Sequence, residues 1–292
     1  MDTLVKLLST QTNVLWSVVI SGVMSSLVAW MFGVLSKRWE IRDKVKVDYN
    51  HDQRKALFEL IGQYKGRLVL HANTFSFRQW NIYKNEQHGW LTQKPGGNLD
   101  GYYFKSTVYR FLSLYCFVHK LDAEAILLDP QIARTSDFSL LKYIAAMRWV
   151  MTDPSLFADI NYDESKPTDH FYTDELREHA QVCWEDDKLT SFEKFKAGPF
   201  QGAALQPVLN FFDGLSKGEP RLRWDRLVAL HLVLLAFVNS FGYDWQYSDK
   251  KKFEEVASKF NHRTVLVNLV HWLGRHHLDE DDQVKQIIKL VK

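Results

Sequence analysis

The C-terminal part of the chain carries the residue types best suited to binding a metal ion. His262, His271, His276 and His277 fall within 16 residues, and the acidic run Asp279-Glu280-Asp281-Asp282 follows them. Imidazoles and carboxylates are transition-metal ligands, but His271 and His276 lie about 140° apart around a helix. A helix end, with His276 and His277 near its negative dipole and Asp279 capping the next helix, explains these residues more simply. We therefore predict no metal and no cofactor.

A second group could perform acid–base chemistry. Glu175, Glu178 and His179 share one expected helix, and the i, i+4 spacing of Glu175 and His179 could hold a metal or relay a proton. An ordinary surface pair is the simpler interpretation. The Walker A, G-x-G-x-x-G, G-x-S-x-G, H-E-x-x-H and C-x-x-C motifs are all missing from the sequence. The sequence thus favours a protein that is not an enzyme, with a membrane-tethered hydrolase using this acidic and histidine site as the alternative.

Charge is distributed unevenly along the chain. Ten acidic residues and two basic ones lie between Asp159 and Asp187, a local charge of −8. Asp174, Glu175 and Glu178 could dock a basic protein partner there, or simply stay solvated. Basic residues flank a later apolar run and could form an anion site or two solvated helix ends: Arg221, Arg223, Arg226, Lys250, Lys251 and Lys252.

The whole chain is nearly neutral. It has 292 residues, of which 25% are charged and 46% hydrophobic, and a formal charge of +2. These proportions are typical of a folded protein, and so small a charge gives no reason to expect nucleic acid as a partner. The two cysteines, Cys116 and Cys183, are too few for a disulfide framework.

One segment is typical of a membrane span. Residues 14–35 contain no charge over 22 positions, which corresponds to about 33 Å of helix and is enough to cross a bilayer. A cleaved signal peptide would have a shorter apolar region and a small-x-small cleavage site. Because basic residues follow the span, we expect residues 1–13 outside and the rest in the cytoplasm. That flank should also face anionic lipid: Lys37, Arg38, Arg42, Lys44 and Lys46.

Small residues recur at every fourth position of this segment. They are Ser17, Ser21, Ser25, Ala29 and Gly33. Such a stripe lets two membrane helices approach closely, so we expect a homo-oligomer whose contact is centred on Ser21 and Ser25. Incidental composition is the alternative explanation. A pore lined by several copies is a second alternative function.

Helical periodicity predicts an all-α fold after the span. We expect a juxtamembrane amphipathic helix and loop over 36–100, and a helical cytoplasmic domain over 101–292. The expected helices cover 57–75, 102–128, 138–151, 172–185, 202–215, 222–241, 249–260 and 263–275, with a short one from 279. The apolar run 227–238 is too short to span a bilayer and contains His231, so we predict a central core helix. A strand pair over 76–84 is the main alternative.

Two stretches carry a resemblance: KSTVYRFLSLYCFVHKLDAEAILLD from Lys105, and FEKFKAGPFQGAAL from Phe192. Their pattern resembles a loose group of bacterial proteins with one N-terminal membrane helix and a helical cytoplasmic region. The resemblance implies this architecture and a bacterial origin, and no activity. With a bacterial origin, the membrane expected from the span is the inner membrane. We expect a membrane-anchored scaffold, sensor or effector module that works by binding.

Overall fold

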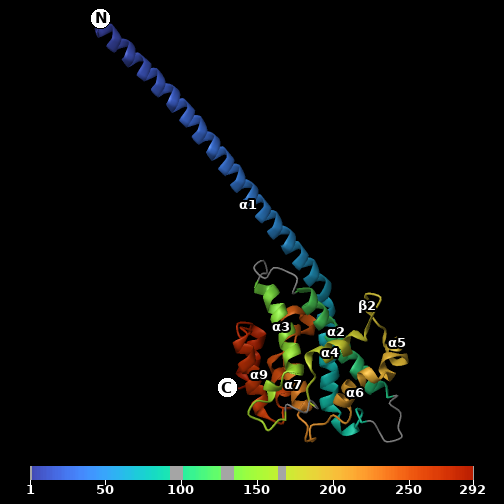
Figure 1. The fold of residues 1–292 in the computed structure, drawn as a ribbon. Coiled ribbons are helices and arrows are strands. Elements are labelled where there is room, and N and C mark those ends of the chain that lie inside the picture. Colours follow the sequence, from blue (N-terminus) through green and yellow to red (C-terminus); the bar gives the residue numbers. More distant parts are fainter. Residues whose placement is uncertain (1, 93–100, 126–134, 164–168, 292) are drawn as a thin grey trace. The chain divides into compact units, whose positions relative to one another are not determined.

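The computed structural model describes the backbone of residues 2–92, 101–125, 135–163 and 169–291, and the side chains of these residues except 2–20 and 135–137. The chain divides into two compact units, Met1–Lys55 and Ala56–Lys292. Ten α-helices and only one pair of two-residue strands occur in the described parts (Figure 1). The all-α fold class predicted from the sequence is therefore confirmed.

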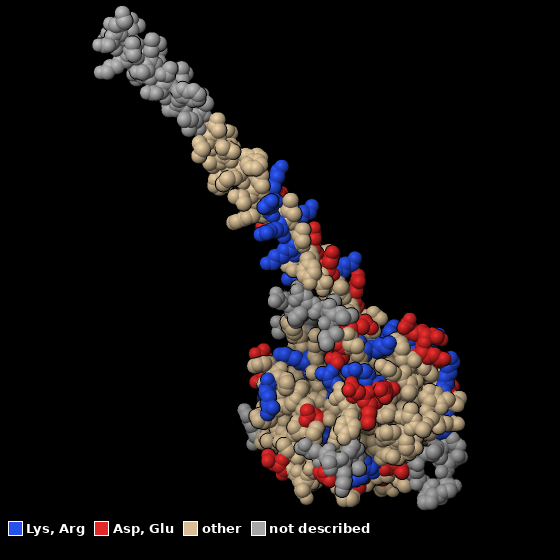
Figure 2. All heavy atoms as spheres, viewed as in Figure 1, with Lys and Arg blue, Asp and Glu red and all other residues tan. Residues whose placement is uncertain are grey.

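The first unit is helical from Asp2 onward, as part of α1 (Asp2–Lys84). No side chain from Ser21 to Ser36 is charged, and all of these except Val34 are exposed. Figure 2 shows this stretch without Lys, Arg, Asp or Glu, followed by the basic residues from Lys37 onward. Positions 14–20 of the expected membrane span, including Ser17, lie outside the described side chains.

The centre of the second unit is α7 (Arg223–Phe241). Among the described residues it is the one helix that is long and apolar enough to cross a membrane, and 83% of its apolar stretch is buried inside the protein. It packs against four other helices: α3 (Thr135–Thr152), α8 (Lys250–Ala257), α9 (Arg263–Arg275) and α10 (Asp282–Lys289). A helix that is apolar on every face belongs inside a protein when neighbours cover it, so the predicted core helix is confirmed.

Residues 56–84 of α1 contribute a second core element, because their apolar face contacts both α7 and α2 (Tyr102–Ala125). The rings of Phe75 and Phe111 lie 5.7 Å apart, and those of Tyr83 and Trp224 lie 5.1 Å apart. The helix continues to Lys84, so the alternative of strands over 76–84 is wrong. Large apolar side chains at helical spacing along this stretch are what keep it helical and buried.

The helices α3 (Thr135–Thr152) and α7 are joined by a buried arginine. Arg226 donates hydrogen bonds to the carbonyl of Val150 and, at 3.2 Å, to that of Asp153. These carbonyls belong to the end of α3, where helical partners are missing. The short helix η2 (Pro154–Phe157) follows, with the Asp153 side chain accepting from the Ser155 amide at 2.8 Å.

The middle of the second unit is more broken than the sequence predicts. Helix α4 (Thr173–Gln181) ends before the hairpin β1 (Trp184–Glu185) and β2 (Lys188–Leu189), whose turn residues Asp186 and Asp187 have φ of 49° and 56°. Two positive φ values in a two-residue turn match the twist of a hairpin. The expected helix 172–185 is therefore too long. After the hairpin comes a helix that the sequence did not predict, α5 (Phe192–Ala197), followed by the short helix η3 (Pro199–Gln201). The expected helix 202–215 is divided into η4 (Ala203–Leu205) and the shorter α6 (Gln206–Phe212).

The C-terminal helices pack on α7, and two of them, α8 and α10, begin at a side-chain cap. After η5 (Asp244–Gln246) come α8 (Lys250–Ala257), α9 (Arg263–Arg275) and α10 (Asp282–Lys289). Asp249 accepts from the Lys252 amide at 2.9 Å, and Asp281 accepts from the Gln283 amide at 2.8 Å. The cap of the last helix is therefore Asp281, and the expectation of Asp279 is wrong.

Candidate functional site

The histidines that could bind metal are dispersed around the end of α9. His271 is exposed, and His276 stacks on Trp272 with the ring centroids 4.0 Å apart. His277 has a φ of 54° and leaves the helix. Among the described side chains, no three His, Cys, Asp or Glu residues are grouped to hold a metal ion.

Helix α4 exposes its acidic residues and buries its histidine. Glu175 and Glu178 are exposed, whereas His179 is buried. Burial lowers the pKa of His179, against the opposing charges of Glu175 and Glu178. Within the described residues no hydrogen bond joins Glu175 to His179, and the role of the pair stays a prediction.

Glu175 instead lines a cleft of about 550 Å³ with His170, Phe171, Asn210 and Arg221 among its other lining residues. Two of its polar side chains already have hydrogen-bond partners within the fold. Arg221 donates from Nε to Asp169 at 2.8 Å, and Nδ1 of His170 is hydrogen-bonded to the hydroxyl of Tyr162. This cleft therefore offers little unused polar chemistry to a ligand.

The arginines expected at an anion site are engaged within the fold. Arg221 pairs with Asp169, Arg223 pairs with Glu219, and Arg226 is bound to carbonyls of the α3 end. Among the lysines, Lys250 pairs with Glu254 at 3.2 Å. Lys252 is different, because it lines a pocket.

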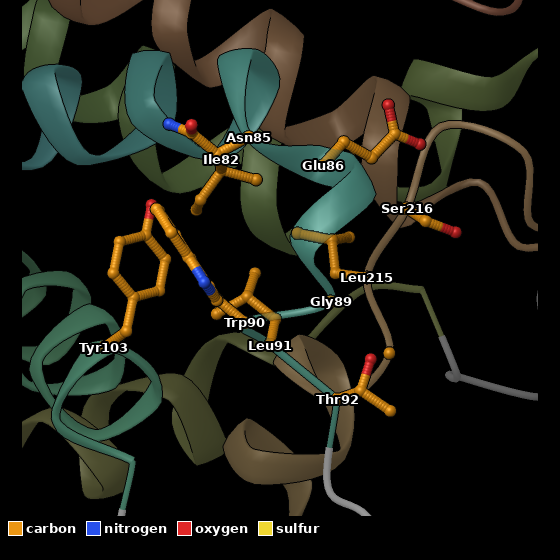
Figure 3. A pocket seen from close by; sticks show the side chains of 11 residues that line it. Ile82, Asn85, Glu86, Gly89, Trp90, Leu91, Thr92, Tyr103, Leu215 and Ser216 are labelled. Atoms are coloured by element: carbon orange, nitrogen blue, oxygen red, sulfur yellow. The ribbon is translucent and has the colours of Figure 1, made fainter.

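Two smaller cavities give no site for catalysis. The pocket of about 120 Å³ in Figure 3 is lined by the Trp90 and Tyr103 rings, and its carboxylate, Glu86, accepts from the Lys217 amide at 2.5 Å. A cavity of about 170 Å³ contains Cys116 and His119. Burial raises the pKa of the Cys116 thiol to about 12 and lowers that of His119 to about 4, so neither the thiolate nor the imidazolium of a reactive pair is favoured.

The strongest candidate is a pocket of about 400 Å³ between α1, α7, η5 and α8. Residues on one face of α1 and two residues one turn apart on α7 form its walls, and the chain from η5 to α8 closes it. The lining side chains are Asn73, Ser76, Phe77, Trp80, His231, Leu235, Trp245, Gln246, Tyr247, Ser248 and Lys252.

The chain after α7 is held tightly against that helix. The Asn239 side chain donates to the Ser248 carbonyl and accepts from the Ser248 amide, both at 2.8 Å. A Cβ at Gly242 would lie 2.6 Å from the Val238 carbonyl oxygen, so only glycine allows this close turn. The wall of the pocket that contains Trp245 is thus fixed by backbone contacts.

A hydrogen bond between distant residues forms the floor of the pocket. Ser76 Oγ lies 2.8 Å from Nε2 of His231, which is fully buried. Burial, and secondarily the charge of Lys252, lower the pKa of His231 to about 3, so the ring is neutral at physiological pH. Its Nδ1 has no partner among the described residues. Buried polar atoms are rarely left unpaired, so this nitrogen retains an unused capacity for one hydrogen bond.

Lys252 lies at the mouth of the same pocket. Its Nζ is 2.8 Å from the centroid of the Trp80 ring. Burial, together with the positive charges of Lys84 and Lys259, lowers the pKa of Lys252 to about 8, against the opposing effects of Glu255 and Asp249. The pocket therefore combines a cation, a neutral imidazole, a hydroxyl and aromatic rings.

This arrangement suits binding better than catalysis. A nucleophilic serine needs a histidine that accepts its proton, and an imidazole with a pKa near 3 is a weak base. Ser76 also lies inside α1, where the backbone amides are used by the helix and cannot stabilise an oxyanion. The sequence carried one signal of the site: His231 is a polar residue within the most apolar helix, and such a residue needs a partner.

Comparisons of the chain with protein-family models, with curated proteins and with solved structures find no match. The resemblance carried by the stretches from Lys105 and Phe192 therefore stays an expectation, as does a bacterial origin. The function must be argued from the site alone.

Proposed function

We propose that the protein is a membrane-anchored binding module whose helical domain binds a small polar ligand in the pocket at Ser76, His231 and Lys252. The carrying observation is His231, a buried neutral imidazole that lines the pocket, holds Ser76 through Nε2 and has no partner for Nδ1 among the described residues. A neutral imidazole nitrogen can donate or accept one further hydrogen bond. Such a ligand would make the domain a sensor or a regulated scaffold.

The anchor in this proposal is the helix over residues 14–35. Its described part carries no charged residue on any face, which suits lipid better than the one-sided apolar stripe of a coiled coil. The basic flank after Ser36 favours an inner-membrane orientation with the helical domain in the cytoplasm. Self-association through the small residues of the span, and anionic lipid at Lys37, Arg38, Arg42, Lys44 and Lys46, belong to the same proposal.

A basic protein partner is a further part of the proposal. Asp174, Glu175 and Glu178 are exposed on α4, and the weak pair of Asp174 with Arg177, at 3.5 Å, leaves the face largely acidic. Asp169 and Glu185 of the same acidic segment pair with Arg221 and Lys194. The docking face is therefore narrower than the −8 segment of the sequence.

A substitution that fills the pocket with a large side chain tests the ligand-binding function. Full-length protein in neutral detergent would be screened against small polar fragments by ligand-observed NMR, together with Asn73→Trp, which places a large ring in the pocket. Asn81→Trp is the matched control, because Asn81 is exposed on the same helix and outside the pocket. Fragments should bind the wild type and Asn81→Trp and be lost from Asn73→Trp. Equal binding to both variants, or no binding to any, would refute the proposal.

The hydrolase alternative has one observation in its favour, the 2.8 Å contact of Ser76 with His231. If Ser76 were an activated nucleophile, phenylmethylsulfonyl fluoride should sulfonylate it, with fluoride leaving and the proton passing to His231. We expect intact-mass analysis to show no adduct at Ser76. An adduct that forms on the wild type and not on Ser76→Ala would support the hydrolase alternative.

A further inference from the structure

Three lysines gather on one indole at the rim of the pocket. The Nζ atoms of Lys252, Lys84 and Lys259 lie 2.8, 5.2 and 6.0 Å from the centroid of the Trp80 ring. Trp80 and Lys84 are one turn apart on α1, whereas Lys252 is in the first turn of α8 and Lys259 follows its end. Two separate helices therefore bring their cations to the same ring.

The position of Lys252 is unfavourable for the fold by itself. The first turn of α8 holds three lysines at the positive end of the helix, where cations are unfavourable, and the capping carboxylate of Asp249 is the only acidic group there. The charges of Lys84 and Lys259 add repulsion. A local arrangement that works against stability is expected where function needs it.

Among the described residues, no carboxylate forms an ion pair with these three lysines. Glu255 and Asp249 are near enough to favour the charged form of Lys252, yet none of the ion pairs formed by described residues includes Lys84, Lys252 or Lys259. Ammonium groups that converge without a paired carboxylate are suited to a multiply charged anion.

The cations and the buried floor share one cavity. Lys252 and Trp80 line the pocket that also contains Ser76 and His231, with its unpartnered Nδ1. The exposed Trp245 ring, with 76% of its surface accessible, lines the same space. A ligand bound there would meet charge at the rim and an apolar wall with a few hydrogen-bonding groups deeper in, as small-molecule sites usually offer.

We propose that Lys84, Lys252 and Lys259 bind the phosphate of a small phosphomonoester whose organic part fills the adjoining pocket at Ser76 and His231. The inference rests on the proposed ligand-binding function and specifies its ligand class. A phosphomonoester fits better than a carboxylate because it carries close to two negative charges at neutral pH and offers three acceptor oxygens to three ammonium groups. A lipid phosphate and a soluble one share this chemistry.

The binding should depend on pH through Lys252. Lys252 is faced by Glu255 and Asp249 of its own helix region, by Lys84 of α1, by Lys259 and by neutral His231 of α7. Its ammonium is present below a pKa of about 8 and is lost above it. Affinity for the phosphate should therefore fall as pH rises from 7 to 9, beyond any change in the ionisation of the ligand itself.

Phenyl phosphate is the probe for the test, with phenol as the match lacking the anion and inorganic phosphate as the match lacking the ring. Calorimetry on full-length protein in neutral detergent would compare wild type, Lys252→Gln and the double variant Lys84→Gln with Lys259→Gln. Lys251→Gln is the control, since it is exposed in the same turn and outside the pocket. Lys252→Gln should bind about ten-fold more weakly, because one hydrogen bond to a charged group is lost, and the double variant, which loses two, should bind more weakly still. The control should not change.

The outcomes separate this inference from the function on which it rests. If phenol enters the pocket and is excluded by Asn73→Trp, but the phosphate adds no affinity or the lysine variants match Lys251→Gln, the phosphate inference is wrong and the binding function survives. If phenyl phosphate binds through the lysines but is unaffected by Asn73→Trp, the site is only a surface anion site and the inference also fails. Competition by phosphatidic acid in nanodiscs, and not by neutral lipid, would support a lipid source of the phosphate.

Discussion

The buried carboxylate of Asp225 on α7 accepts the backbone amide of His262 at 2.9 Å and lies 2.8 Å from Nδ1 of the same residue. It also accepts the Asn261 amide at 2.6 Å. Asp225 is in the first turn of the helix, where the macrodipole favours a negative charge. One side chain therefore joins the start of the core helix to the turn between α8 and α9.

Asp225→Ala should destabilise the domain by about 2–4 kcal/mol, because two backbone amides lose an ionised acceptor in a partly buried place. His262→Ala is the matched control. It keeps both amide contacts and removes a half-exposed ring together with its Nδ1 contact to Asp225, so its cost should stay below about 1 kcal/mol. Urea denaturation followed by near-UV circular dichroism measures both, and equal costs would contradict this account of the contact.

The helices could be predicted because their apolar residues recur with the period of the structure. The run 227–238 is a different case, because it is apolar on every face and only its length and composition predict a central helix. The hairpin at Asp186 and Asp187 could not be predicted. Its turn needs two positive φ values, which Asn and Gly usually supply, and the flanking strands have only two residues each.

The candidate pocket was missed for a different reason. Ser76 and His231 are 155 residues apart, and nothing in their local sequence pairs them. The spacing of Glu175 and His179 suggests an acid–base pair, yet in the fold Glu175 is exposed and His179 is buried. Spacing finds neighbours along a helix, whereas sites formed between helices depend on packing.

His119→Leu should make the domain less sensitive to acid. Burial, together with the charges of Arg177 and Arg148, lowers the pKa of His119 from 6.5 to about 4, so below pH 6.5 the unfolded chain binds a proton that the folded chain refuses. Stability is therefore lost as pH falls from about 6.5 to 4, by up to about 1.4 kcal/mol per pH unit for this group. His71 and His231, with pKa values of about 4 and 3, act in the same direction.

The measurement is the free energy of unfolding in urea at pH 7, 6 and 5. Both ring nitrogens of His119 lack a partner among the described residues, so leucine should also stabilise the domain at pH 7, by about 1 kcal/mol. His271→Leu, which replaces an exposed imidazole on α9, serves as the control. A pH profile of His119→Leu parallel to that of the wild type would show that the ring is protonated in the folded state.

Self-association should depend on close packing of the span and not on its hydroxyl groups. Ser25 donates to the Ser21 carbonyl at 2.7 Å, and Ser26 donates to the Gly22 carbonyl at 2.9 Å, so both hydroxyls are used within their own helix. Ser25→Ala should therefore keep the dimer signal in a membrane two-hybrid assay. Ser21→Leu combined with Ser25→Leu should weaken it several-fold by separating the backbones. An unchanged signal in the double variant would place the contact outside the stripe.

Anchorage should fail when charge enters the middle of the span. Leu27→Arg with Val28→Arg places two guanidinium groups near the centre of residues 14–35, at a cost of about 2.5–3.5 kcal/mol each for insertion. The variant should be extracted by alkaline carbonate, whereas the wild type should stay with the membrane. Val45→Arg with Val47→Arg is the control, because it adds the same charges to exposed positions beyond the span. Extraction of the wild type, or equal behaviour of the two variants, would mean that this segment does not hold the protein in a bilayer.

A reporter fused after Lys292 should be active only in the cytoplasm, since the basic residues follow the span, and periplasmic activity would reverse the orientation.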